Sequence, residues 1–121
     1  MKVTLKQAVD SIQGLREIML VKMPLATAMQ LDKIITVCDE EIQRFQKLNQ
    51  EKYKELGEQI EGEKEGTLRI KAENIDQYVS ETNAILATEI DLPGEKINSQ
   101  DLKNIELSPI GFRQLKDWLI A

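Results

Sequence analysis

A long apolar seam constrains this chain more than any other sequence feature. Apolar residues recur in it at alternating steps of three and four, at Ala28, Leu31, Ile35, Cys38, Ile42 and Phe45. Such spacing is typical of a helix that packs along one face against a second helix. Pro24 suits the first turn of this helix, and Gly57 opens a segment rich in Glu and Gly. The pattern therefore predicts a helix over residues 25–56.

A second apolar stripe lies upstream of the seam. Thr4 and Gln7 have the spacing of a capping box, in which two side chains satisfy free backbone N–H groups at a helix start. The apolar residues that follow again recur at steps of three and four, at Leu5, Ala8, Val9, Ile12, Leu15 and Met19. We expect a helix over 5–21. Gly14 interrupts its stripe at a cost of about 1 kcal/mol relative to Ala, which is compatible with a close approach of another helix.

The two expected helices differ in length. The short Met23–Pro24 junction predicts that they form an antiparallel helical hairpin. At 1.5 Å per residue the second helix is about 48 Å long and the first about 25 Å, so the first covers about half of the second. The uncovered half must be buried by the C-terminal part of the chain or by another subunit; its apolar residues are Ile42, Phe45, Leu48, Tyr53 and Leu56. We therefore expect a homo-oligomer, with a dimer as the favoured order.

The rest of the chain is a small part of mixed structure. An acidic Glu/Gly loop is expected over 57–66, and 67–121 should form a small α+β part. "TLRI" at 67–70 and "TEIDL" at 88–92 are typical of short strands, and they flank a helix that Asn74 can cap. The two strands could pair in parallel through a crossover or as antiparallel partners. Ser99 is a candidate cap for a single turn over 100–104. The fold class is mainly α (α+β), with one domain over 1–121.

The C-terminus closes on an apolar helix. Ser108 and Pro109 are a favoured cap and first position for a helix of about twelve residues, which would be marginal alone in water. We expect this amphipathic helix to dock on the protein's own body, on the uncovered half of the long helix. Whether that surface belongs to the same subunit or to a neighbour stays open. The predicted interaction or core surface comprises Ile42, Phe45, Leu48, Tyr53, Phe112, Leu115, Trp118 and Leu119, and the second-choice contact surface comprises Met19, Met23 and Met29.

The charge balance narrows the range of partners. The chain has 16 basic and 21 acidic residues, a net charge of -5. Residues 1–36 carry five basic and three acidic groups, residues 37–66 five and nine, and residues 67–121 six and nine. This distribution argues against binding to nucleic acid or to anionic membranes, which requires clustered Lys and Arg. No apolar run approaches the ~20 residues of a membrane helix, and one cysteine fits a reducing compartment. We expect a cytoplasmic protein.

The composition excludes several kinds of catalytic site. The chain has no histidine, so a histidine base or imidazole metal site is impossible, and a single cysteine excludes the structural zinc motifs. Cys38 lies in the apolar seam, where a thiol behaves as a small hydrophobe. Glu89 and Asp91 share a strand face, which favours the charged face of an edge strand over a pair of catalytic carboxylates. We expect no enzymatic activity, no cofactor and no metal.

The order of features resembles a widespread family of small, uncharacterised proteins of tailed phages and prophages. The resemblance lies in "MPLATAMQLDKIITVCDEEIQRFQKLNQEKY" (23–53), in the acidic loop, in "ETNAILATEIDL" (81–92) and in "LKNIELSPIGFRQLKDWLI" (102–120). It covers nearly the whole chain and rests on pattern instead of a catalytic motif; Met23 before the proline is a departure from it. The resemblance implies a phage or prophage origin and a bacterial host cytoplasm, and it brings no catalytic residues with it.

Two hypotheses of function remain. The favoured one is a non-enzymatic protein–protein interaction module that associates with itself and binds a phage or host protein. The alternative is a small-ligand protein that binds or sequesters an anionic nucleotide and so counters host defence. A phosphate ligand needs converging basic groups, and the candidates Lys22, Lys33, Arg69, Lys71 and Arg113 are scattered in the sequence.

Overall fold

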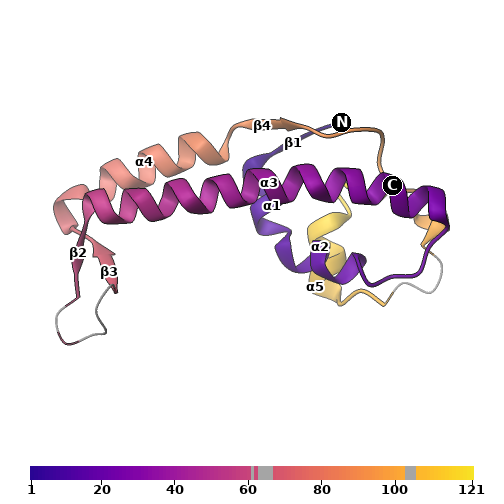
Figure 1. The fold of residues 1–121 in the computed structure, drawn as a ribbon, viewed down its shortest axis with the longest axis horizontal. Helices are drawn as coiled ribbons and strands as arrows, with labels where there is room; N and C mark the ends of the chain where they lie inside the picture. Colours follow the sequence, from indigo (N-terminus) through magenta and orange to yellow (C-terminus); the bar gives the residue numbers. More distant parts are fainter. Residues whose placement is uncertain (61, 63–66, 103–105) are drawn as a thin grey trace.

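A computed structural model describes residues 1–60, 62, 67–102 and 106–121. The fold is mostly helical and is built on one helix of 32 residues, α3 (Leu25–Leu56), which runs along the molecule (Figure 1). Pro24 takes the N-cap position with an extended ψ of 147°, and Gly57 takes the C-cap position. Both predicted ends of the long helix are therefore confirmed.

The first helical segment is divided in two. The predicted capping box is present, since the Gln7 backbone N–H donates to Thr4 Oγ1 and the Thr4 N–H donates to Gln7 Oε1. The helix that it starts, α1 (Leu5–Asp10), has six residues, and a second helix, α2 (Ile12–Ile18), begins after Ser11. Figure 1 shows α1 passing behind α3 and α2 running in a different direction below it. The prediction of one helix over 5–21 is wrong, because the apolar stripe continues through a break that other parts of the chain stabilise.

Two small antiparallel sheets replace the pairing considered from the sequence. β3 (Leu68–Ile70) and β4 (Glu89–Asp91) lie within the predicted strands, but they do not pair with each other. β4 pairs with β1 (Lys2–Thr4), and β3 pairs with β2 (Gly57–Gln59). β2 also corrects the expected loop over 57–66, whose first three residues are strand. Both missed strands have three residues, which is too short for an alternating pattern to reveal them.

The segment after β3 turns into α4 (Ile75–Leu86) through a 3-10 turn, η1 (Ala72–Asn74). Asn74 precedes α4 as predicted, but its side chain makes no cap hydrogen bond there. Its Nδ2 instead donates to the Leu56 carbonyl at 3.0 Å, so it ties α4 to the end of α3.

A second 3-10 turn, η2 (Ser99–Asp101), precedes the C-terminal segment. Its cap is Asn98, whose Oδ1 accepts from the Gln100 N–H at 2.9 Å, so the assignment of Ser99 as the cap is wrong. Asn98 is the better cap because its carbonyl oxygen reaches the N–H two residues on. The predicted turn over 100–104 otherwise falls partly on 103–105, which lie outside the described residues.

The C-terminal helix, α5 (Pro109–Leu115), begins as the Ser108-Pro109 pair predicts. The Ser108 hydroxyl accepts from the Gly111 N–H at 3.0 Å, and Pro109 is the first helical residue. The helix has seven residues instead of the expected twelve. Beyond it the chain turns, and Ile120 forms a parallel bridge to Ile97.

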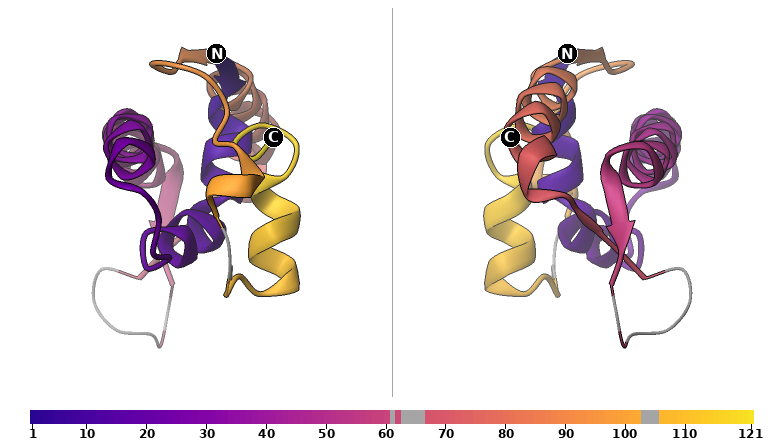
Figure 2. Two further views of the ribbon diagram at one scale, coloured as in Figure 1. Left: turned by 90° about the vertical axis from the view of Figure 1, so that its right-hand side faces the viewer. Right: turned by 90° about the vertical axis from the view of Figure 1, so that its left-hand side faces the viewer.

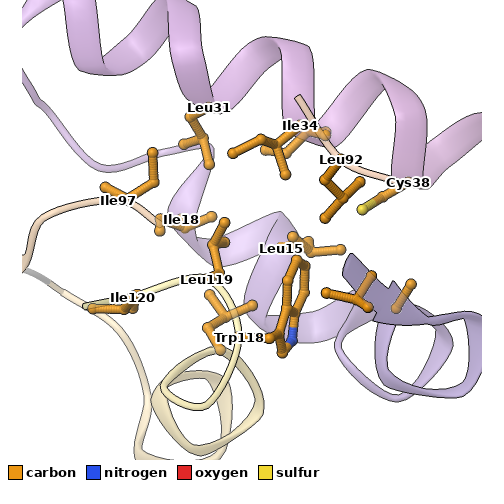
Figure 3. Packing of buried hydrophobic residues seen from close by; sticks show 14 of the residues in the cluster. Leu15, Ile18, Leu31, Ile34, Cys38, Leu92, Ile97, Trp118, Leu119 and Ile120 are labelled. Carbon is orange, nitrogen blue, oxygen red and sulfur yellow. The ribbon is translucent and has the colours of Figure 1, made fainter. Parts of the chain in front are cut away.

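One apolar core joins the two ends of the chain. Viewed along α3, this helix lies on one side and α5 on the other, with α1 and α2 between them (Figure 2). Figure 3 shows Trp118 and Leu119 pointing toward Leu15 and Ile18, with Leu31 and Ile34 of α3 above them. The buried cluster comprises Val3, Leu5, Ala8, Leu15, Ile18, Leu31, Ile34, Ile35, Cys38, Ile42, Ile90, Leu92, Ile97, Leu102, Leu115, Trp118, Leu119 and Ile120.

Candidate functional site

The C-terminal residues that the sequence nominated are mostly core. Leu115 and Leu119 are fully buried, and Trp118 is 4% exposed. The Trp118 indole Nε1 donates to Ser11 Oγ and to the Gln114 carbonyl, each at 3.0 Å. Phe112 differs from these three, because 46% of it is exposed. Three of the four residues therefore stabilise the fold and are not open to a partner.

α5 packs on α2, and this corrects the expected docking site on the uncovered half of the long helix. The two helices cross where Gly14 faces Gly111: a Cβ at Gly14 would lie 2.7 Å from the Gly111 carbonyl oxygen and 2.8 Å from Leu115 Cγ. The Gly14 N–H lies in the first turn of α2, where it has no partner within the helix, and it donates to Gln114 Oε1 at 2.8 Å. Because Gly14 and Gly111 are small and the Gly14 N–H gains a partner, α5 fits more closely on α2 than on the distal surface of α3. Gly14 does mark a close helix approach.

The distal half of α3 is covered by α4. Tyr53 meets Tyr78 edge to face, with ring centroids 5.3 Å apart, and the Tyr78 hydroxyl donates to Asn49 Oδ1. Lys52 forms an ion pair with Glu81 at 3.1 Å, which raises the pKa of the lysine. Along this half of α3, Ile42 and Leu56 are buried, Phe45 and Tyr53 are half-buried, and Leu48 is 41% exposed. The C-terminal half thus covers most of the overhang without a second subunit.

α4 is itself poorly covered. None of its twelve residues, all of which the structure describes, is buried. Ile75 and Val79 lie four positions apart on one flank, and each is 47% exposed. We call these two residues the α4 stripe.

Further exposed apolar side chains lie around the connection between α2 and α3. Four large side chains are exposed there: Met19 by 58%, Leu20 by 86%, Leu25 by 77% and Met29 by 57%. We call these four residues the turn patch. Met23, the other methionine nominated from the sequence, is half-buried and packs against the core.

Sequence reasoning missed Leu20 and Leu25. The available signal was that Leu25 and Met29, four positions apart, lie off the seam that begins at Ala28. Apolar residues that share a helix face opposite the core face are candidates for a contact surface.

Three hollows beside α3, taken over their described residues, do not bring the basic candidates together. The groove between α2 and α3, of about 340 Å³, is lined mainly by apolar and amide side chains, with Arg16 and Asp39 as the charged ones among its described residues. Lys22 and Lys33 line separate hollows near the start of α3.

The other basic candidates for a phosphate site lie elsewhere. Arg69 is on β3, which pairs with β2 at the C-terminal end of α3. There the arginine forms an ion pair with Glu58 at 2.9 Å. Lys71 follows β3, and Arg113 is on α5. A single chain therefore does not bring the five candidate residues together.

Cys38, Glu89 and Asp91, the residues considered for chemistry, lie in positions that a purely structural role explains. Burial, with a smaller contribution from the charge of Asp39, raises the pKa of the Cys38 thiol to about 11. Glu89 and Asp91 are exposed on β4, and Glu89 lies 3.8 Å from Lys2 of the paired strand. In the part of the chain that the structure describes, no three acidic or cysteine side chains converge as metal ligands would. Likewise, no described helix is long and apolar enough to cross a membrane.

Comparisons with protein-family models, with curated proteins and with solved structures find no match to this chain.

Proposed function

We propose that this protein is a non-enzymatic interaction module that associates with itself and binds a protein partner. The turn patch is the observation that carries the proposal. It exposes four large apolar side chains by 57–86% each, all within one connection and the first turns of one helix. Exposed apolar groups gathered in this way are typical of contact surfaces, and flexible methionines adapt to the shape of a partner.

The proposal includes the antiparallel helical hairpin expected from the sequence. In it, α2 and α3 are the two arms, and the turn patch lies at their closed end. α5 is the amphipathic helix that braces α2, through the Gly14–Gly111 crossing. A brace of this kind keeps the turn patch in a fixed shape, so that binding orders few residues and loses little conformational entropy.

The setting of the proposal comes from the sequence. The resemblance to phage and prophage proteins supports a phage-encoded protein that acts in the cytoplasm of the bacterial host, on a phage or host protein. A non-enzymatic role is supported by the lack of histidine and by the burial of Cys38.

Dilution calorimetry of the full chain tests self-association through the turn patch. Injection of a concentrated solution into buffer should release a dissociation heat that decays with concentration. Leu25→Gln/Met29→Gln should remove most of that heat, because glutamine keeps the helix propensity but removes the apolar contact. The control is Ile110→Gln, which changes an equally exposed apolar residue on α5 and should retain the heat. Equal heats from all three proteins would overturn the proposed role of the turn patch.

A further inference from the structure

The groove between α2 and α3 combines an apolar wall with polar side chains that the fold leaves unused. Its volume is about 340 Å³, within the range of sites that hold small ligands. Ile12, Leu15 and Ile42 form most of the apolar wall; Leu15 and Ile42 are buried, and Ile12 is half-buried. All the groups discussed below line this one hollow, so they face the same space.

Two charges of opposite sign line the groove without pairing. Arg16 comes from α2 and Asp39 from α3. Within the described part of the chain, neither side chain has a hydrogen-bond or ion-pair partner, although both line the same hollow. An exposed ion pair would add little to stability, so the fold loses little by leaving the two charges apart. Both heads are therefore available to a bound molecule.

Two amides continue the polar row on α3. Gln43 and Gln46 follow Asp39 at steps of four and three, so the three side chains share one helix face over about 10 Å. Each amide offers a donor group and an acceptor oxygen. Neither amide has a hydrogen-bond partner among the described residues. A peptide bond carries the complementary donor and acceptor.

The charges of the groove select the charge of its ligand. An anion such as phosphate would meet Asp39 as well as Arg16, and a cation would meet Arg16 as well as Asp39. Nearby charges do not alter this balance, because Glu17 is held by the start of α5, and Glu41 forms an ion pair with Arg44. A molecule with one charge of each sign gains a charge-assisted hydrogen bond at both ends.

We propose that the groove between α2 and α3 binds a small zwitterion with an apolar side chain, either an apolar amino acid or a dipeptide. The ligand's carboxylate contacts Arg16, and its ammonium group contacts Asp39. Its apolar side chain covers Leu15 and Ile42, and the amides of α3 pair with the peptide bond of a dipeptide. This inference goes beyond self-association and does not rest on it, since Met19 alone of the turn patch lines the groove.

Titration calorimetry of the full chain with three probes tests the proposal. L-leucine and L-leucyl-L-leucine are zwitterions of one and two residues, whereas N-acetyl-L-leucinamide has the same apolar side chain and neither charge. We expect saturable heat from the zwitterions and none from the uncharged analogue. Tighter binding of the dipeptide would assign the amides to a peptide bond, and tighter binding of leucine would assign the site to a free amino acid.

Two outcomes with these probes would overturn the proposal. One is that neither zwitterion saturates the chain at millimolar concentration. The other is that the uncharged analogue binds as tightly as the zwitterions, which would show that the charges do not select the ligand. Either result leaves self-association intact, because the mass of the chain in solution measures it separately.

Variants of the two charged residues locate the site. Arg16→Gln and Asp39→Asn each remove one charge at an exposed position and should each weaken binding of the zwitterions roughly ten-fold or more. The matched controls, Arg113→Gln on α5 and Asp76→Asn on α4, remove the same charges outside the groove and should bind like the unaltered chain. The emission of buried Trp118 verifies that each variant is folded. Unchanged affinity in both groove variants would overturn the assignment of the site.

Discussion

Glu17 of α2 holds the start of α5 through Ser108. Its carboxylate accepts from the Ser108 backbone N–H at 2.6 Å and from the Ser108 hydroxyl at 2.9 Å, across 91 residues of sequence. The same hydroxyl accepts from the Gly111 N–H, so one serine both caps α5 and ties it to α2. The ends of the chain are therefore joined by a charged hydrogen bond as well as by apolar contact.

This contact predicts a pH dependence of stability. The Ser108 N–H, and then its hydroxyl, lower the pKa of Glu17 from its ordinary value of 4.5. Because the folded-state pKa lies below the unfolded one, the stabilisation is present above pH 4.5 and is lost as pH falls through the folded-state pKa. Urea midpoints should fall less steeply in acid for Glu17→Gln than for the unaltered chain. Parallel acid profiles would show that Glu17 titrates normally.

The crossing of α2 and α5 makes Gly14 sensitive to a single methyl group. An exposed helical Gly→Ala change usually stabilises by up to about 1 kcal/mol. Here the new Cβ would lie 2.7 Å from the Gly111 carbonyl oxygen, so the helices must move apart. We expect Gly14→Ala to destabilise by roughly 1–3 kcal/mol, measured by urea unfolding. A variant more stable than the unaltered chain would mean that the crossing is looser than described.

The ends of α3 and the start of α5 could be predicted from the sequence. Pro24 and Gly57 delimit α3 correctly, and Ser108 and Pro109 mark the start of α5, because these signals act on the local backbone. The break at Ser11 has no such signal. Its hydroxyl accepts from Trp118, and Gln114 pairs the free N–H of Gly14, so residues about 100 positions away stabilise the break.

The candidate surfaces were less predictable than the helices. An apolar residue in a helix pattern can face the core, as Leu115 does, or solvent, as Leu25 does, and periodicity alone does not separate the two when several faces are apolar. The docking site of α5 depended on two glycines whose partner positions the sequence does not reveal. Met19 and Met29, the second-choice contact residues, are exposed, and Trp118, which is expected to dock on the protein's own body, is buried.

A charged side chain introduced into the buried seam of α3 should strongly destabilise the fold. Ile35 is 6% exposed in the core, so Ile35→Asp would bury a carboxylate without a partner, at a cost of several kcal/mol. This is a large part of the about 5–15 kcal/mol that stabilises a small domain. Thr36→Asp, at the exposed neighbouring position, is the control. We expect only the Ile35 variant to lose its cooperative thermal transition; similar melting of the two would place Ile35 outside the core.

Cys38 should report on the opening of the same seam. It is fully buried, and its pKa is raised to about 11, so at pH 8 about one thiol in a thousand is ionised. A thiol reagent should label the native chain slowly and the urea-unfolded chain at the rate of a free cysteine. Rapid labelling without urea would contradict the buried position of Cys38.

The molar mass of the unaltered chain in solution tests the central claim most directly. Light scattering over a micromolar concentration series, at fixed pH and salt, should give a mass above 13.8 kDa that rises reversibly with concentration. Leu25→Gln/Met29→Gln, measured over the same series, should stay at the monomer mass. A constant 13.8 kDa for the unaltered chain at every concentration would contradict self-association through the turn patch.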